Sequence, residues 1–156
     1  MAIAPQLKTY LNDAGIVYDV VSHPRTMTTT ESAQAAHVSG ECVAKSVVIH
    51  HELGYFLAVV PSTHRIDLNT LQALAGKRLG LAAEAEIGEI FTDCDLGAVP
   101  PVGEAYGVEV MLEESLSGLP DVYFEGGDHK TLIHASGDAF ETMMKDARRG
   151  RFSHHV

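Results

Sequence analysis

The sequence predicts an α+β fold, in which helices pack on a mixed or mostly antiparallel β-sheet. Three observations lead to this prediction. Segments rich in β-branched residues and segments of helical periodicity are mixed, without the regular βα repeat of a parallel fold. The two strongest strand-like runs are separated only by HELG, which indicates a hairpin. The length of 156 residues, 46% of them hydrophobic, suits one core, so we expect a single domain over 1–156.

The first third of the chain is predicted to form a helix, a strand and a second helix. Segment 5–15 begins with proline and ends with glycine, which favour the first turn and the C-cap of a helix. Segment 16–23 follows as a β-branched strand. Thr28 precedes Glu31 by three residues, the spacing of a capping box, so a helix begins there and ends near Gly40.

The rest of the chain contains the hairpin and a mixture of shorter elements. The hairpin covers 44–67, where β-branched and aromatic residues favour strands. Asp67 is the expected N-cap of the next helix. The later elements are helices at 67–80, 82–91 and 136–149, the last capped by Ser136, and strands at 107–113, 121–127 and 130–136.

Composition and charge exclude several classes of protein. A net charge of −10 argues against binding nucleic acid by bulk electrostatics, and we interpret the basic segment 145–151 as a solvated helix end. Two cysteines in no paired spacing favour a reducing cytoplasm. The chain has no apolar run of about 18 residues and its start lacks the features of a secretory signal, so we expect a cytoplasmic protein without membrane contact.

Metal chemistry is a weak alternative despite nine histidines. His50 and His51 are adjacent in a predicted strand, so they point to opposite faces and cannot share one site. The HExxH and paired CxxC spacings of zinc sites are absent. A metal-dependent hydrolase would use one of these two histidines with His64, but we expect no metal and no cofactor.

Covalent and nucleotide chemistry also lack their motifs, because GxSxG, the Walker loop and GxGxxG are missing. Cys94 lies between two acids, which disfavour a reactive thiolate. Lys45 is the one charged residue between Cys42 and Ile49. Its ammonium would usually extend to solvent, but over a pocket it would orient a phosphate, a carbonyl oxygen or a developing oxyanion.

Two further stretches carry candidate functional residues. DCDLGAVPPVGEAYG, at 93–107, combines Gly, which lets a backbone approach a ligand, with Pro, which stiffens the loop. GGDHKTLIHASGDAF, at 126–140, gathers His129, Ser136 and Asp138 around a strand end and a helix start. The last two residues equally fit an N-cap and a first-turn acid.

In their order along the chain, these stretches resemble the YbaK/ProX aminoacyl-tRNA editing family, free-standing deacylases related to the insertion domain of bacterial prolyl-tRNA synthetase. The resemblance rests on HPRTMTTTESAQAA, AKSVVI, VVPSTHRIDLNTL, GAVPPVG and GGDHKTLIHASGDAF, from about His23 to Phe140. It implies a curved, mixed and mostly antiparallel sheet with flanking helices and a cleft for the aminoacylated 3′ end of tRNA. It also implies metal-free hydrolysis of the ester that joins a wrong amino acid to the terminal ribose.

The resemblance assigns roles to individual residues. Lys45 corresponds to the family's pocket lysine, and Gly97 and Ala98 begin its Gly-Pro loop, where their backbone N–H groups would face the ester carbonyl. We count these three as catalytic. The expected substrate-binding residues are Thr30, Ser46, Val99, Pro100, Pro101, His129, Ser136 and Asp138.

The expected substrate is alanine on proline tRNA, since Ala98 and Val99 suggest a narrow pocket that selects by exclusion, with Cys- or Ser-tRNA next. The expected partner is the acceptor end of a mischarged tRNA, bound near Lys45 and the C-terminal bases. Association with a synthetase would compensate for the weak tRNA affinity of an acidic protein. The alternative is a non-catalytic module that binds a synthetase, the tRNA acceptor end or a small metabolite.

Overall fold

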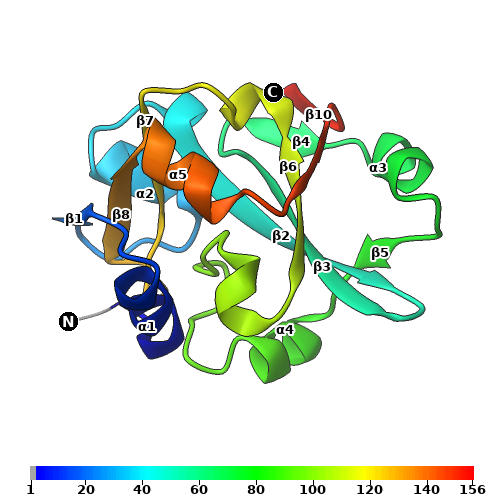
Figure 1. The fold of residues 1–156 in the computed structure, drawn as a ribbon, viewed down its shortest axis with the longest axis horizontal. Coiled ribbons are helices and arrows are strands. Elements are labelled where there is room, and N and C mark those ends of the chain that lie inside the picture. The colour runs from blue at the N-terminus through cyan, green and yellow to red at the C-terminus, as the bar shows by residue number, and fades with distance from the viewer. Residues whose placement is uncertain (1–2) are drawn as a thin grey trace.

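The computed structural model describes residues 3–156, and most of these residues surround one mixed β-sheet (Figure 1). Its strands are β1 (Tyr18–Ser22), β2 (Val43–His51), β3 (Gly54–Pro61), β5 (Gly80–Leu81), β6 (Glu109–Glu113), β7 (Asp121–Glu125), β8 (Thr131–Ser136) and β9 (Arg148–Gly150). They follow the order β1-β8-β7-β2-β3-β6-β9, with β5 added beside β2. The pairings β2–β7, β3–β6 and β6–β9 are parallel and the other four are antiparallel, which confirms the predicted fold class.

The predicted hairpin is confirmed as β2 and β3, which form the centre of the sheet. Side chains of β2 alternate between its two faces. Ala44 and Val48 pack in a core on one face, whereas Ile49 packs in a second core on the other face. One strand therefore supports two hydrophobic cores, and neighbouring residues on it face different surroundings.

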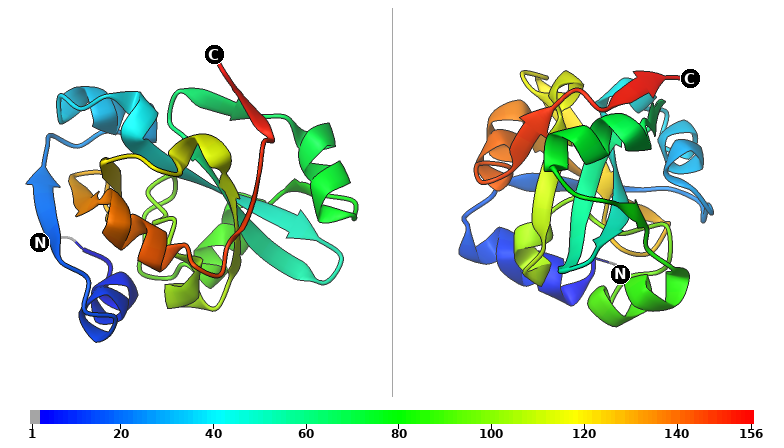
Figure 2. Two further views of the ribbon diagram at one scale, coloured as in Figure 1. Left: turned by 45° about the horizontal axis from the view of Figure 1, so that its top comes forward. Right: turned by 90° about the vertical axis from the view of Figure 1, so that its right-hand side faces the viewer.

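The helices cover both faces of the sheet. They are α1 (Pro5–Asp13), α2 (Thr29–Ala35), α3 (Leu68–Ala75), α4 (Glu84–Ile90) and α5 (Gly137–Met143), with 3₁₀ turns at Gly40–Cys42, Gly103–Tyr106 and Glu114–Leu116. Leu7 of α1 and Phe140 of α5 join the first core, whereas Leu71 of α3 joins the second. Figure 2 shows α1 and α5 toward one end of the sheet and α3 toward the other. No helix of the described residues is long and apolar enough to span a bilayer.

The last predicted helix is shorter than expected, and the interpretation of 145–151 as a solvated helix end is wrong. The helix ends at Met143, and Arg148–Gly150 instead forms β9 beside β6. The outer edge of β6 offers backbone groups that need partners, and pairing with them outweighs the local helical preference. Arg149 folds back to pair with Glu141 at 2.7 Å.

Two of the three predicted N-caps are confirmed. The side chains of Thr28 and Ser136 each accept a backbone N–H three residues later, at 3.1 Å. Asp67 precedes α3 without capping it, and its carboxylate pairs with His154 at 2.8 Å. That histidine belongs to a separate two-stranded ribbon of β4 (His64–Ile66) and β10 (Ser153–His155).

Gly137 gives a test of the junction between β8 and α5. Its N–H donates to the carbonyl of Pro120 at 2.8 Å, and a Cβ there would collide with the carbonyl of Leu119. Because a backbone atom cannot move aside easily, we expect Gly137→Ala to lower the free energy of unfolding by about 2 kcal/mol in urea denaturation.

Gly88→Ala is the matched control. A Cβ at Gly88, inside α4, would meet open space, so this change should raise the free energy of unfolding by about 0.5–1 kcal/mol. Equal destabilisation by both changes would contradict the steric explanation.

Candidate active site

Lys45 lies in the wall of a cavity of about 510 Å³. Thr30 of α2 lines the same cavity, so the structure brings these two predicted residues together. The complete lining is Thr30, Lys45, Val47, Ser62, His64, Arg65, Ile66, Leu68, Leu81 and Val156. An apolar wall with a few polar groups and cations is typical of sites for small ligands or the ends of larger ones.

The Lys45 ammonium is half-buried and oriented by a backbone group. Its Nζ donates a hydrogen bond to the carbonyl oxygen of His64 at 3.0 Å. Burial lowers the pKa of Lys45 from its ordinary value, and the guanidinium of Arg65 lowers this pKa further. Among the described residues, no ion pair includes either cation. Both are therefore available to a phosphate or an oxyanion.

The sheet is interrupted beside Ser46. β7 pairs with β2 only at Val43 and Ala44, and β5 pairs with it only at Ile49 and His50. The carbonyl of Val43 accepts from the N–H of Ser62, just after β3, so by alternation the backbone groups of Ser46 face the opposite edge, where this gap lies. Its Oγ is buried and has no hydrogen-bond partner among the described residues. The gap thus offers an unpaired backbone N–H and an unpaired backbone carbonyl to a ligand.

The Gly-Pro loop lies on the other face of β2 from Lys45. Ala98 is fully buried, and Val99, which is 7% exposed, packs in the core that also contains Ala44 and Val48. Pro100 and Pro101 are buried as well, so these four side chains anchor the loop to the protein interior. The structure does not place them in the lining of the Lys45 cavity.

Gly97 and Ala98 differ in what their backbone can offer. The N–H of Ala98, which we predict to face the ester carbonyl, donates to the carbonyl of Asp95 at 3.1 Å in this structure and closes a turn. Gly97 is exposed and has a φ of 81°, a conformation that favours glycine. A Cβ on it would lie 3.1 Å from the His129 ring and 3.3 Å from the Met27 carbonyl. No hydrogen bond from its N–H occurs within the described residues, so Gly97 is the loop's candidate donor.

A buried pair, Glu125 and His129, supports this loop from below. Both side chains are 2% exposed, with His129 Nδ1 3.9 Å from Glu125 Oε2. The Nε2 of His129 contacts the carbonyl oxygen of Leu96 and must donate to it. Burial raises the pKa of Glu125 to about 7, although hydrogen bonds from Ser32 and Thr29 lower it. His129 therefore holds the loop and does not line the Lys45 cavity.

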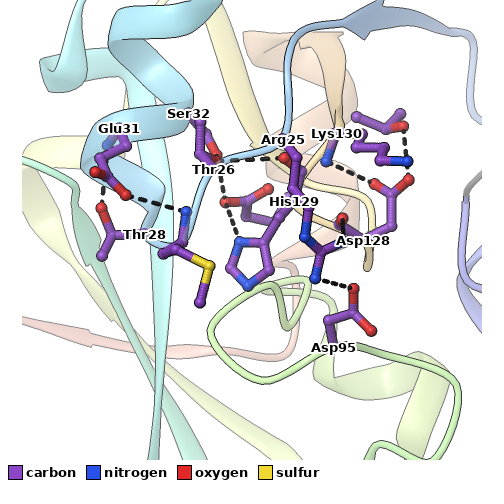
Figure 3. A network of polar contacts seen from close by, with 12 residues as sticks. Arg25, Thr26, Thr28, Glu31, Ser32, Asp95, Asp128, His129 and Lys130 are labelled. Carbon is purple, nitrogen blue, oxygen red and sulfur yellow. Dashed lines mark hydrogen bonds and ion pairs between the residues drawn. The ribbon is translucent and has the colours of Figure 1, made fainter.

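The segment before α2 connects the loop and the buried pair (Figure 3). Arg25 reaches Asp95 of the loop at 3.5 Å. The hydroxyls of Thr26 and Ser32 lie 2.6 Å apart, and Ser32 donates to Glu125 at 2.9 Å. Since Thr30 of α2 lines the cavity and Ser32 of the same helix contacts Glu125, a shift of α2 would affect both the cavity and the buried pair.

Ser136 and Asp138 lie outside the lining of the Lys45 cavity. Ser136 is the N-cap of α5, and Asp138 occupies its first turn, where a negative charge is favoured. The structure gives these two residues a role at the junction of β8 and α5.

Sequence reasoning missed Arg65 and Val156 in the cavity lining. Both reach Lys45 only because β4 folds back and pairs with β10, which no local pattern predicts. Two of the four C-terminal bases expected near the acceptor end are held in ion pairs. Arg149 pairs with Glu141 and Arg151 with the carboxylate at position 114.

The described residues contain no group of three or more His, Cys, Asp or Glu side chains that could hold a metal ion. The Nδ1 of His64 instead contacts the hydroxyl of Ser153 at 2.8 Å. Burial raises the pKa of Cys94 to about 12, so this thiol stays protonated at neutral pH.

Comparison with solved structures agrees with this fold. A candidate trans-editing enzyme for prolyl-tRNA synthetase has a crystal structure 29% identical to this chain, with a TM-score of 0.84 over 97% of this chain and 96% of its own. A scaffold protein for computational epitope grafting is 28% identical, with a TM-score of 0.83 over 97% of both chains. A hypothetical protein that is 23% identical shares the fold, with a TM-score of 0.83 over 96% of this chain and 99% of its own.

No curated protein matches the chain in sequence. The aminoacyl-tRNA editing domain, however, matches residues 23–143, which include Lys45, the Gly-Pro loop and the Glu125–His129 pair. With this match over most of its length and the geometry above, the chain belongs to the aminoacyl-tRNA editing domain family.

Proposed function

We propose that this protein is a trans-editing deacylase that hydrolyses the ester between a wrong amino acid and the terminal ribose of a tRNA. Family membership supports the reaction class, and the similar structure described as a candidate editing enzyme for prolyl-tRNA synthetase supports action on proline tRNA. One observation carries the proposal. Lys45 presents a half-buried ammonium, without a carboxylate partner among the described residues, to a cavity of about 510 Å³.

The reaction needs few protein groups. In our proposal the ester occupies the gap beside Ser46, and Lys45 and Arg65 hold the negative charge of the terminal nucleotide. A positioned water attacks the carbonyl carbon, the ester C–O bond breaks, and the products are the amino acid and the free ribose hydroxyl. The N–H of Gly97 would stabilise the oxyanion formed on the way. The neighbouring ribose hydroxyl already activates the ester, so positioning replaces a protein base.

We propose alanine on proline tRNA as the first substrate, followed by cysteine and serine esters. Val47, Leu81 and Val156 form an apolar part of the cavity wall. None of these three side chains can form a hydrogen bond with a larger polar side chain of the substrate. Such a wall selects mainly by size, because it distinguishes a single methylene only weakly.

A panel of mischarged tRNAs tests the reaction. Ala-, Cys- and Ser-tRNA(Pro) are incubated with the protein beside correctly charged Pro-tRNA(Pro), and the loss of labelled amino acid is followed. We expect Lys45→Ala to lower kcat/KM on the hydrolysed species by about 100-fold, because the cation that holds the terminal nucleotide, and thereby positions the ester, is lost.

Lys8→Ala is the matched control for that experiment. Lys8 is exposed on α1, far in sequence from the cavity, and its removal should leave the rate unchanged. Binding of charged tRNA without hydrolysis of any ester would favour the non-catalytic module instead of the enzyme.

We also propose that the reaction needs no metal ion. Deacylation after exhaustive treatment with EDTA should proceed at the untreated rate, since Lys45, Arg65 and the Gly97 N–H supply the positive and donating groups. A loss of activity that zinc or magnesium restores would contradict this part of the proposal.

The support of the loop by Glu125 predicts a pH dependence of stability. The pKa of Glu125 is about 7 in the folded protein, above its ordinary value of 4.5, so the folded state keeps a proton that the unfolded chain loses. The stabilisation from neutral Glu125 is therefore complete below about pH 4.5 and is lost as the pH rises to about 7, a change of about 3 kcal/mol.

Glu125→Gln removes this titration while keeping the size and neutral form of the side chain. We expect the free energy of unfolding of the variant, relative to wild type, to rise between about pH 5 and about pH 7 in urea denaturation. A difference that stays constant over this range would show that Glu125 is ionised throughout.

A further inference from the structure

The rim of the Lys45 cavity is the ribbon of β4 and β10, which pair with each other and with no strand of the main sheet in the described residues. One edge of β4 faces β10, where the N–H of Val156 donates to the carbonyl of Thr63 at 3.0 Å. By alternation the next carbonyl, that of His64, turns to the other edge and accepts the Lys45 ammonium. An isolated two-stranded ribbon is marginally stable in water, so its position needs an anchor.

The anchor is the carboxylate of Glu113, at the end of β6, which is 3% exposed. Its Oε1 accepts from the N–H of Phe152 at 3.0 Å, from the N–H of Ser153 at 2.9 Å and from the Ser153 hydroxyl at 2.7 Å. Its Oε2 accepts from the N–H of Ser115 at 3.4 Å. Burying a carboxylate is costly unless it is hydrogen-bonded, and these donors meet that requirement. The fully buried Phe152 ring adds an apolar contact to the second core.

Ser153 extends this contact to the cavity. Its hydroxyl hydrogen goes to Glu113, because a carboxylate can only accept. The same oxygen must then accept from the Nδ1–H of His64 at 2.8 Å, which fixes the tautomer and orientation of that ring. Hydrogen bonds thus link Glu113 to Ser153 and Ser153 to the His64 ring, and the backbone carbonyl of the same histidine accepts from Lys45.

We propose that Glu113 and Ser153 are positioning residues for Lys45, acting through the ribbon that holds the His64 carbonyl and Arg65 beside it. The consequence for catalysis rests on the proposed function, whereas the consequence for the lysine rests on the hydrogen bonds alone. β10 lies outside residues 23–143, which match the family, so family membership alone does not assign it to the site.

The test uses the titration of Lys45 itself. Besides Lys45, the charged or titratable residues in the described cavity lining are His64 and Arg65, both in β4. Burial and the Arg65 guanidinium lower the pKa of Lys45, and both effects depend on the closed ribbon. In full-length protein labelled with ¹³C-lysine, we expect Ser153→Ala and Glu113→Gln to raise this pKa toward its ordinary value. The loss of one signal in Lys45→Arg assigns the resonance.

Two further variants separate positioning from general damage. Glu114→Gln makes the same chemical change one residue away, at an exposed carboxylate that pairs with Arg151, and should leave the Lys45 titration unchanged. Ser153→Thr keeps the hydroxyl and should restore the wild-type titration. Where Glu113→Gln does not fold, Ser153→Ala decides the outcome, because it removes the hydroxyl and leaves the carboxylate with its backbone donors.

Deacylation gives the second measurement. We expect Ser153→Ala to lower kcat/KM by about tenfold, the kinetic equivalent of one lost hydrogen bond. An unchanged Lys45 titration in both Ser153→Ala and Glu113→Gln would overturn the positioning role, whether or not any tRNA is hydrolysed. A raised pKa in a protein that hydrolyses none of the esters would retain that role and reject the proposed function.

Discussion

The structure depends on how the two edges of β2 pair with other strands. One edge pairs with β3 along its length, while the other pairs with β7 at its start and with β5 at its end. Lys45 and Ser46 lie where the second edge has no partner among the described strands. Because side chains alternate along a strand, the side chain of Lys45 points toward the cavity and that of Ser46 points toward the core beneath the Gly-Pro loop. The same pairing that holds the sheet together thus creates the place where a ligand can reach its backbone.

Features that depend on residues close together in the sequence were predicted, whereas features that depend on pairing between distant segments were not. The hairpin and the caps at Thr28 and Ser136 depend on residues a few positions apart, so their patterns were sufficient. The gap beside Ser46 and the approach of Arg65 to Lys45 depend on strands that pair from distant parts of the chain. Burial was equally hidden from the sequence. The small apolar side chains of the Gly-Pro loop suit a pocket wall and a core alike, and tertiary packing placed them in the core.

Unsatisfied polar atoms concentrate around the proposed site. In the part of the chain that the structure describes, five buried side-chain polar atoms lack a hydrogen-bond partner, and three belong to Ser46, Glu125 and His129. Each such atom costs about 1–3 kcal/mol, so folding alone gives no reason to gather them. The Ser46 hydroxyl belongs to the residue beside the gap and is buried on the face of β2 that carries the first core. The other two atoms belong to neighbouring side chains beneath the loop, with His129 Nδ1 3.9 Å from Glu125 Oε2, and a proton retained by Glu125 lowers the cost of burying this pair.

The charge distribution of the molecule favours binding of one end of an anionic substrate over contact along the whole substrate. The chain has a net charge of −10, and two of its arginines near the C-terminus are held in ion pairs. Nucleic-acid affinity grows with the number of phosphates neutralised, so broad contact with a tRNA body would find little support on this surface. Lys45 and Arg65 differ because neither has a carboxylate partner in the described residues and both are held beside a cavity. The ribbon that keeps them there is therefore as much a part of recognition as the two charges.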